Sequence, residues 1–159
     1  MSSNIEIEEI LKDKKQFLGC FPIDKIPNLN KNESIIINTD SHDEEGTHWM
    51  GLKITSKNVC LFFDSFGEPP NKNIINNLSK QFRKLVYSSI QIQSVFSNKC
   101  GEFSMQFICM VKDRKSFYYF ISLHYCFSHI LVPVGVFATP HPFTNRNREQ
   151  NTLSQECAT

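Results

Sequence analysis

Four side chains in this sequence could cooperate in one reaction: His48, Asp64, Gln93 and Cys100. An ionised thiol attacks a carbonyl carbon, an imidazole takes and returns the proton, a carboxylate orients the imidazole, and an amide donates a hydrogen bond to the oxyanion that forms. No other set of side chains in the sequence offers these four functions together. The chemistry that they predict is nucleophilic attack by an activated cysteine.

Cys100 stands where a polar loop meets an amphipathic helix that we predict over 100–111. A helix N-terminus carries partial positive charge, which favours a thiolate over a thiol, and a neighbouring imidazolium favours it further. Gly101 follows and leaves room for a substrate backbone. A buried structural cysteine is the alternative, and the position at a loop-to-helix junction favours the nucleophile. The apolar face of this helix carries Phe103, Phe107 and Val111.

His48 and Asp64 lie at the two open ends of a predicted hairpin. Its strands cover 48–55 and 59–64, and Ser56-Lys57-Asn58 connects them. Because the second strand of an antiparallel pair returns to the start of the first, Asp64 should lie beside His48. The carboxylate would then fix the tautomer and orientation of the ring, so that His48 can act as a general base. The alternatives are a structural histidine and an aspartate that caps a turn.

Trp49 and Gln93 complete the predicted site. The Trp49 indole could cover the cleft, exclude water and admit only slim substrate residues, or it could belong to the core. Gln93 ends a short strand predicted over 89–93, seven positions before Cys100. Its amide could join the Cys100 N–H in an oxyanion hole. Gln91 lies on the same face of that strand, and spacing alone does not choose between the two amides.

The remaining elements mix helices with antiparallel strands and show no βαβ repeat, which is typical of the α+β class. Residues 34–38 carry three consecutive isoleucines and predict a buried strand. A helix over 71–86 is predicted from apolar residues at helical spacing, namely Ile75, Leu78, Phe82 and Leu85. We also expect a helix over 4–15 with Ile7, Ile10 and Leu11 on one side, a loop over 17–27, and a helix or a strand over 117–127.

Composition bounds the function classes. The 159 residues suffice for one domain, and 40% of them are apolar, which is enough for a core. A formal net charge of +1 gives no overall field to attract nucleic acid or an anionic membrane. The six cysteines form no Cys-x-x-Cys pair, so we expect no metal site and no cofactor. The first residues lack the pattern of a signal peptide, so we expect an intracellular protein with reduced thiols.

One stretch, 116–140, carries no Asp, Glu, Lys or Arg and is long enough to cross a membrane. Two histidines and Pro133 interrupt it, so we expect a buried helix followed by a strand rather than a membrane anchor. Residues 144–159 are polar and predict a disordered tail. We therefore expect residues 1–143 to form a single domain.

Four segments of the chain carry a resemblance to a known family. They are residues 17–27; residues 34–38 with Gly46-Thr47-His48-Trp49; residues 62–70, which include Phe62-Phe63-Asp64-Ser65-Phe66-Gly67; and Gln93 with Ser97-Asn98-Lys99-Cys100-Gly101-Glu102-Phe103. Together they resemble the adenain, or adenovirus-protease, type of cysteine peptidase, especially the versions found in Polinton or Maverick transposons and related DNA viruses. This family is related to the SUMO and ubiquitin-like-protein proteases. The resemblance covers about residues 15–112.

The resemblance implies a papain-like α+β fold in permuted order (His–Asp–Gln–Cys), with a central antiparallel or mixed sheet packed on helices. It assigns a triad to His48, Asp64 and Cys100, and it selects Gln93 from the two amides for the oxyanion hole. The adenovirus enzyme has Glu where Asp64 stands, whereas the ubiquitin-like-protein proteases have Asp, so the role is kept. Beyond about residue 114 the chain diverges from the family.

The resemblance also implies an activity. An endopeptidase of this type would cleave after or near glycine in viral or transposon capsid-type precursors, in the cytoplasm or nucleus of a host cell or in a virion. One alternative is a protease for SUMO-type modifiers, and another is a catalytically inactive binding module on the same fold. Nucleic acid enters as a partner only by analogy with the adenovirus enzyme, because the net charge gives it no support. The sequence makes no prediction of the oligomeric state.

Overall fold

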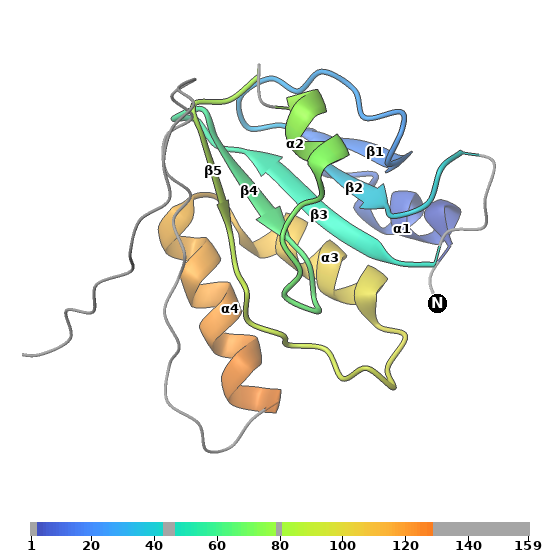
Figure 1. Ribbon diagram of the computed structural model, residues 1–159, viewed down its shortest axis with the longest axis vertical. Coiled ribbons are helices and arrows are strands. Elements are labelled where there is room, and N and C mark those ends of the chain that lie inside the picture. Colours follow the sequence, from blue (N-terminus) through green and yellow to red (C-terminus); the bar gives the residue numbers. More distant parts are fainter. Residues whose placement is uncertain (1–2, 43–46, 79–80, 129–159) are drawn as a thin grey trace, which may run out of the picture.

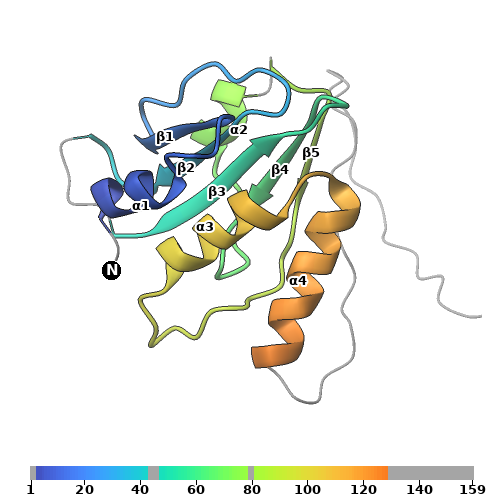
Figure 2. The same cartoon turned by 180° about the vertical axis from the view of Figure 1, so that it is seen from behind.

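One five-stranded sheet organises the chain, and helices cover both of its faces (Figure 1 and Figure 2). The computed structural model describes residues 3–42, 47–78 and 81–128. The strands follow chain order across the sheet: β1 (Phe17–Pro22), β2 (Ser34–Asn38), β3 (Trp49–Ile54), β4 (Val59–Phe63) and β5 (Lys84–Tyr87). The two outer pairs are parallel and the two inner pairs are antiparallel. The sheet is therefore mixed, and the expected α+β class is confirmed.

The helices divide unequally between the two faces. One face packs against α1 (Asn4–Leu11), α3 (Cys100–Met110) and α4 (Arg114–Ser128), and the other packs against α2 (Lys72–Leu78) (Figure 2). Successive strand residues point to opposite faces, so Ile36 joins the first core while its neighbours Ile35 and Ile37 join the second. The run of isoleucines is thus buried on both sides, as expected for a central strand.

The contact between β3 and α3 sets the position of the site. Gly51 lies in the middle of β3, opposite Phe63 of β4. A Cβ atom on Gly51 would lie 2.4 Å from Cδ1 of Phe107, which is below any real contact distance. The missing side chain lets the Phe107 ring lie on the strand and stack on Phe63, with 5.3 Å between ring centroids. Glycine at this position therefore fixes how closely α3 approaches β3.

The N-terminal part of the fold corrects two expectations. The first helix begins after Ser3, which forms a capping box with Glu6, and ends at Leu11 rather than at residue 15. Ile7 and Leu11 are buried, but Ile10 is 63% exposed because residues four positions apart share a face more closely than residues three apart. The segment expected as a loop over 17–27 begins with β1, which pairs in parallel with β2.

Two expectations between residues 71 and 93 are wrong. The predicted helix over 71–86 splits into α2 and β5, because Leu78 and Leu85 reach the same core from a helix and from a strand. The helical spacing of these two leucines therefore arose by chance, because α2 and β5 each place one leucine in the same core. The strand expected over 89–93 does not form. The backbone N–H groups of Ile92 and Gln93 donate instead to the carbonyl of Ser65.

The C-terminal expectations are settled in part. The alternatives for 117–127 resolve to a helix, α4, whose buried residues are Phe117, Phe120 and Ile121. Across the described ranges, no helix has the length and hydropathy needed to cross a bilayer. The strand expected after this helix and the tail over 144–159 lie outside the described residues. The single domain over 1–143 stays a prediction.

Candidate active site

The hairpin of β3 and β4 brings His48 and Asp64 together. His48 directly precedes β3, Asp64 directly follows β4, and the antiparallel register pairs Gly51 with Phe63. Nε2 of His48 lies 3.1 Å from Oδ2 of Asp64. The other carboxylate oxygen accepts a hydrogen bond from the N–H of Phe66 at 2.7 Å. Both oxygens are thus engaged, and the side chain of Asp64 is only 4% exposed.

Cys100 reaches the same place from the first residue of α3. Ser104, one turn later, donates its hydroxyl to the carbonyl of Trp49 at 3.1 Å, and this hydroxyl is fully buried. The bond ties the first turn of α3 to the first residue of β3. The Gly51–Phe107 contact holds the next turn, so the distance between the Cys100 thiol and the His48 ring is determined by packing on β3.

The electrostatics of Cys100 favour a thiolate. Burial alone would raise the pKa of this thiol, but the adjacent His48 ring with its charge, together with the backbone N–H groups of Trp49 and Gly101, lowers it below the usual 9.0. The N–H of Gly101 belongs to the first turn of α3, where unpaired backbone donors point out of a helix. Cys60, buried without such partners, has its pKa raised instead.

His48 shifts in the complementary direction. Burial alone would lower the pKa of the imidazole, but the hydrogen bond and charge of Asp64, together with Cys100, raise it to about 9. The ring also lies against Phe66, with 4.8 Å between centroids. Its second nitrogen, Nδ1, is buried and lacks a partner at full hydrogen-bond geometry. The sulfur therefore lies within electrostatic reach of Nδ1 but not at an ideal bonding position, as is common for catalytic pairs without substrate.

Gln93 is held at both ends of its amide. Oε1 accepts from the Ser65 hydroxyl at 2.7 Å, and Nε2 donates to the carbonyl of Ser97 at 2.7 Å. An amide nitrogen has two hydrogens, so one N–H of Gln93 remains for another acceptor. Gln91 is exposed, and its own amide donates to the Gln93 carbonyl at 2.8 Å. The two glutamines thus differ clearly: Gln93 is buried and bonded to the loop that precedes Cys100, whereas Gln91 is exposed and holds the Gln93 backbone.

Sequence reasoning missed Ser65. Its hydroxyl orients the Gln93 amide, its carbonyl accepts two backbone N–H groups from Ile92 and Gln93, and it is fully buried. Gly67 allows this close contact: its φ is +76°, and a Cβ there would lie 2.8 Å from the Ile90 carbonyl carbon. The signal available in the sequence was a small hydroxyl residue directly after the strand-end acid, followed by a glycine two positions later.

The two predicted cleft residues, Trp49 and Gly101, are both buried next to Cys100. Trp49 is 5% exposed and packs in the core with Cys100, and its backbone lies in β3 opposite Asn38 of β2. Its role in a substrate cleft stays a prediction. Gly101 is buried in the first turn of α3, where its N–H acts on the sulfur. Gly46 of the predicted motif lies outside the described residues.

The arrangement can form a buried thiolate–imidazolium pair. Over the described ranges, no group of three or more His, Cys, Asp or Glu side chains is placed to hold a metal ion. The Cys100 thiol and the His48 imidazole are the side-chain types that support nucleophilic attack by sulfur with proton transfer through one imidazole. A carboxylate fixes the imidazole on its far side, and a rigid amide lies on the loop that leads to the sulfur.

Comparisons with known proteins support the fold. No family model and no curated protein matches the sequence. Among solved structures, the chain is similar to the ASFV pS273R protease, with a TM-score of 0.56 and 17% sequence identity. The similarity covers 76% of this chain and 60% of that one, so the chain spans less than two thirds of the protease's length. At this identity the likeness shows a shared fold.

Proposed function

We propose that this chain is a cysteine peptidase in which Cys100 is the nucleophile, His48 the general base and acid, and Asp64 the residue that orients His48. The observation that carries the proposal is the meeting of three elements: His48 Nε2 lies 3.1 Å from Oδ2 of Asp64, and Cys100 begins α3, whose first turn is tied to Trp49 beside His48. The lowered pKa of Cys100 and the raised pKa of His48 agree with this geometry. A cysteine and a histidine with purely structural roles would not require this arrangement. The likeness to a protease fold adds support from an independent direction.

The reaction follows from these positions. The Cys100 thiolate attacks the carbonyl carbon of a peptide bond and a C–S bond forms, while the carbonyl electrons move onto oxygen. The free N–H of Gln93 and the backbone N–H of Cys100 are the donors that we assign to this oxyanion. The His48 imidazolium gives its proton to the leaving amine as the C–N bond breaks. Water, deprotonated by His48, then attacks the thioester and releases the acid and the thiol.

We further propose that the peptidase is of the adenain type. The chain order His48, Asp64, Gln93, Cys100 is the permuted order of that family, and the mixed sheet with α3 under β3 accommodates it. A preference for glycine and a capsid-type precursor as substrate rest on the sequence resemblance alone. The same holds for action inside a host cell or a virion. The alternatives are processing of a SUMO-type modifier and an inactive binding module.

A labelling experiment tests the nucleophile. The full chain is treated with a thiol-reactive peptide electrophile, and the modification rate of each cysteine is measured by mass spectrometry. We expect Cys100 to react much faster than the exposed Cys109, and His48→Ala to remove this advantage. Cys109→Ala is the matched control and should change nothing. Equal rates at Cys100 and Cys109 would favour the inactive module.

Turnover then tests the reaction and separates the substrates. Cys100→Ala should abolish cleavage of a glycine-containing peptide library, because no other group at the site can form the thioester. If this variant cleaves as well as the parent, Cys100 is not the nucleophile. Parallel reactions with a diglycine-tailed modifier and with a capsid-type structural protein compare the two substrate classes. Faster cleavage of the modifier would move the assignment to the SUMO-type alternative.

A further inference from the structure

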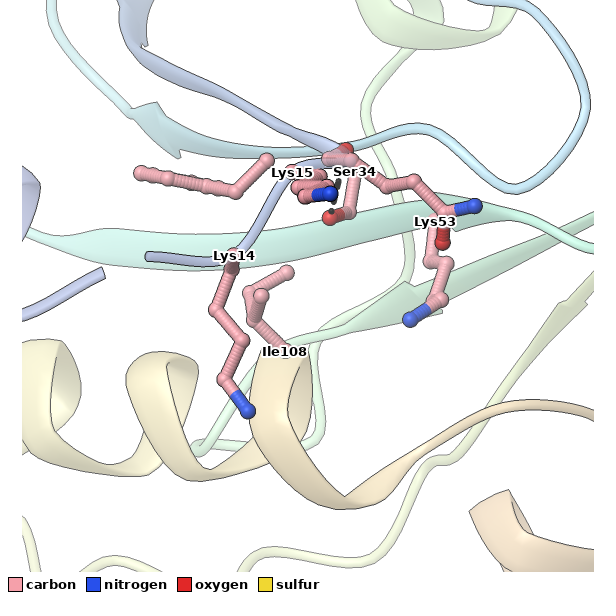
Figure 3. A pocket seen from close by; sticks show the side chains of 7 residues that line it. Lys14, Lys15, Ser34, Lys53 and Ile108 are labelled. Atoms are coloured by element: carbon pink, nitrogen blue, oxygen red, sulfur yellow. Dashed lines mark hydrogen bonds between the residues drawn. The ribbon is translucent and has the colours of Figure 1, made fainter. Parts of the chain in front are cut away.

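A cavity lies at the end of the β3–α3 contact that is remote from Cys100. Its volume is about 110 Å³, and lysines from two separate segments line it (Figure 3). Lys14 and Lys15 come from the connection after α1, and Lys53 comes from the far end of β3. Ile108 of α3 provides an apolar wall, and Figure 3 shows it between Lys14 and Lys53. Three lysine residues thus line one small opening, Lys14 and Lys15 with exposed side chains and Lys53 with a half-buried one.

These lysines lack internal counter-charges. Within the described ranges, neither Lys14, Lys15 nor Lys53 forms an ion pair with a carboxylate. Asp13 directly precedes Lys14 in the chain and forms no ion pair with these lysines in the part that the structure describes, and Glu33, which precedes Ser34 of the cavity lining, accepts hydrogen bonds from Asn30 instead. Burial is the main cause that lowers the pKa of the Lys53 ammonium; Cys109 opposes this shift, and the positive charges of Lys14 and Lys112 add to it. The cluster is therefore electrostatically unfavourable when empty.

We propose that this cavity binds a small phosphate-class oxyanion, held by Lys14, Lys15 and Lys53. The opening has room for a compact anion, since about 10–15 Å³ of such space already holds one water molecule. The net charge of +1 also provides no long-range field for a polyanion such as nucleic acid. This site is separate from the peptidase site and does not depend on the proposed function.

Binding there has a structural consequence. The anion would bridge β3 to the connection after α1, and Lys112, just beyond α3, adds attraction from a third segment. A ligand that binds the folded chain and not the unfolded chain stabilises the fold in proportion to its saturation. The melting temperature should therefore rise with phosphate concentration.

The test uses thermal unfolding of the full chain in inorganic phosphate and in sodium chloride of equal ionic strength. We expect a rise in Tm with phosphate only, and we expect Lys53→Gln to weaken phosphate binding by at least about tenfold, since a charge-assisted bond contributes about 1.5–3 kcal/mol. Without phosphate, Lys53→Gln should melt at the same temperature or higher, because it removes a half-buried, repelled charge. The matched control is Lys57→Gln, an exposed lysine in the β3–β4 turn.

Three results would overturn the proposal. One is an equal rise in Tm with sodium chloride, which would mean general screening. Another is an equal loss in Lys57→Gln and Lys53→Gln, which would mean a diffuse effect of surface charge. The third is tighter binding of a single-stranded oligonucleotide than of phosphate, with an equal loss of affinity in Lys53→Gln. That result would identify a surface for polyanions instead.

Discussion

The two ends of the β3–α3 contact handle charge in opposite ways. At one end, His48 and Cys100 can carry opposite charges, and each pKa moves toward the ionised form. At the other end, Lys53 lies among like charges, and its pKa moves away from the ionised form. At the first end, both charges have partners within the chain: Asp64 stabilises the His48 imidazolium, and backbone N–H groups stabilise the Cys100 thiolate. The second becomes favourable when an outside anion supplies the missing charge.

The largest effect that separates the two ends should come from Asp64→Asn. Loss of the carboxylate removes the main group that raises the pKa of His48, so kcat/KM should fall by up to about 10⁴-fold and leave residual activity. The phosphate dependence of Tm should stay unchanged, because Lys53 lies at the other end. A simultaneous loss of both properties would show that the variant disturbs the whole β3–α3 contact.

The pH dependence of the same variant sharpens this result. The folded pKa of His48 is raised to about 9 from 6.5, so its contribution to stability is fully present below pH 6.5 and is lost as the pH rises through about 9. The alkaline limit of activity should lie near the same pH, since the imidazolium must protonate the leaving amine. In Asp64→Asn both features should move to lower pH. Urea unfolding and pH–rate profiles measure the two shifts.

Gly51→Ala should affect both ends, because Gly51 lies between them on β3. The new methyl group collides with Phe107, and overpacking of this kind costs about 1–3 kcal/mol of unfolding free energy. A shift of α3 by about 1 Å should also lower kcat/KM roughly 10²-fold. In Gly51→Ala/Phe107→Leu the smaller side chain relieves the collision, so the losses should be less than the sum of the single variants. Additive losses would show that the collision is not the cause.

Ser65→Ala should have the smallest effect on activity, and it should change only the orientation of the Gln93 amide, the proposed oxyanion donor. Loss of the hydroxyl frees the Gln93 amide to turn, and we expect kcat to fall about tenfold, less than the 10²- to 10³-fold typical of losing a donor outright. Alkylation of Cys100 by iodoacetamide forms no oxyanion and should keep its rate. In a Gln93→Ala background, Ser65→Ala should cause little further loss. An independent loss there would mean that Ser65 acts on stability alone.

The sequence predicted the contact between His48 and Asp64 better than it predicted the surrounding helices and strands. Hairpin geometry placed Asp64 beside His48 because antiparallel register is a local property of a short connection. The split of 71–86 into α2 and β5 was not predictable from periodicity, because a helix and a strand can bury leucines at the same spacing when both cover one face. The depth of Trp49 depends on its partner in β2, which no local pattern reveals.

The lysine cavity and the role of Ser65 were also beyond the sequence. Lys14 and Lys53 are 39 positions apart, and their approach depends on how the connection after α1 crosses the sheet. Ser65 reads as an ordinary turn residue until the segment around Gln93 is seen packed against it. In both cases the decisive partner is distant in the chain.

The adjacency of Asp64 and Ser65 has an evolutionary consequence. Asp64 contacts His48 and the next residue, Ser65, hydrogen-bonds to Gln93, so a single inserted or deleted residue at this corner would disrupt both contacts at once. The connection at 56–58 faces no such demand, because its length can vary without moving either partner. Natural variants of this chain should therefore differ in length at the 56–58 turn and keep the spacing from Asp64 to Gly67 invariant.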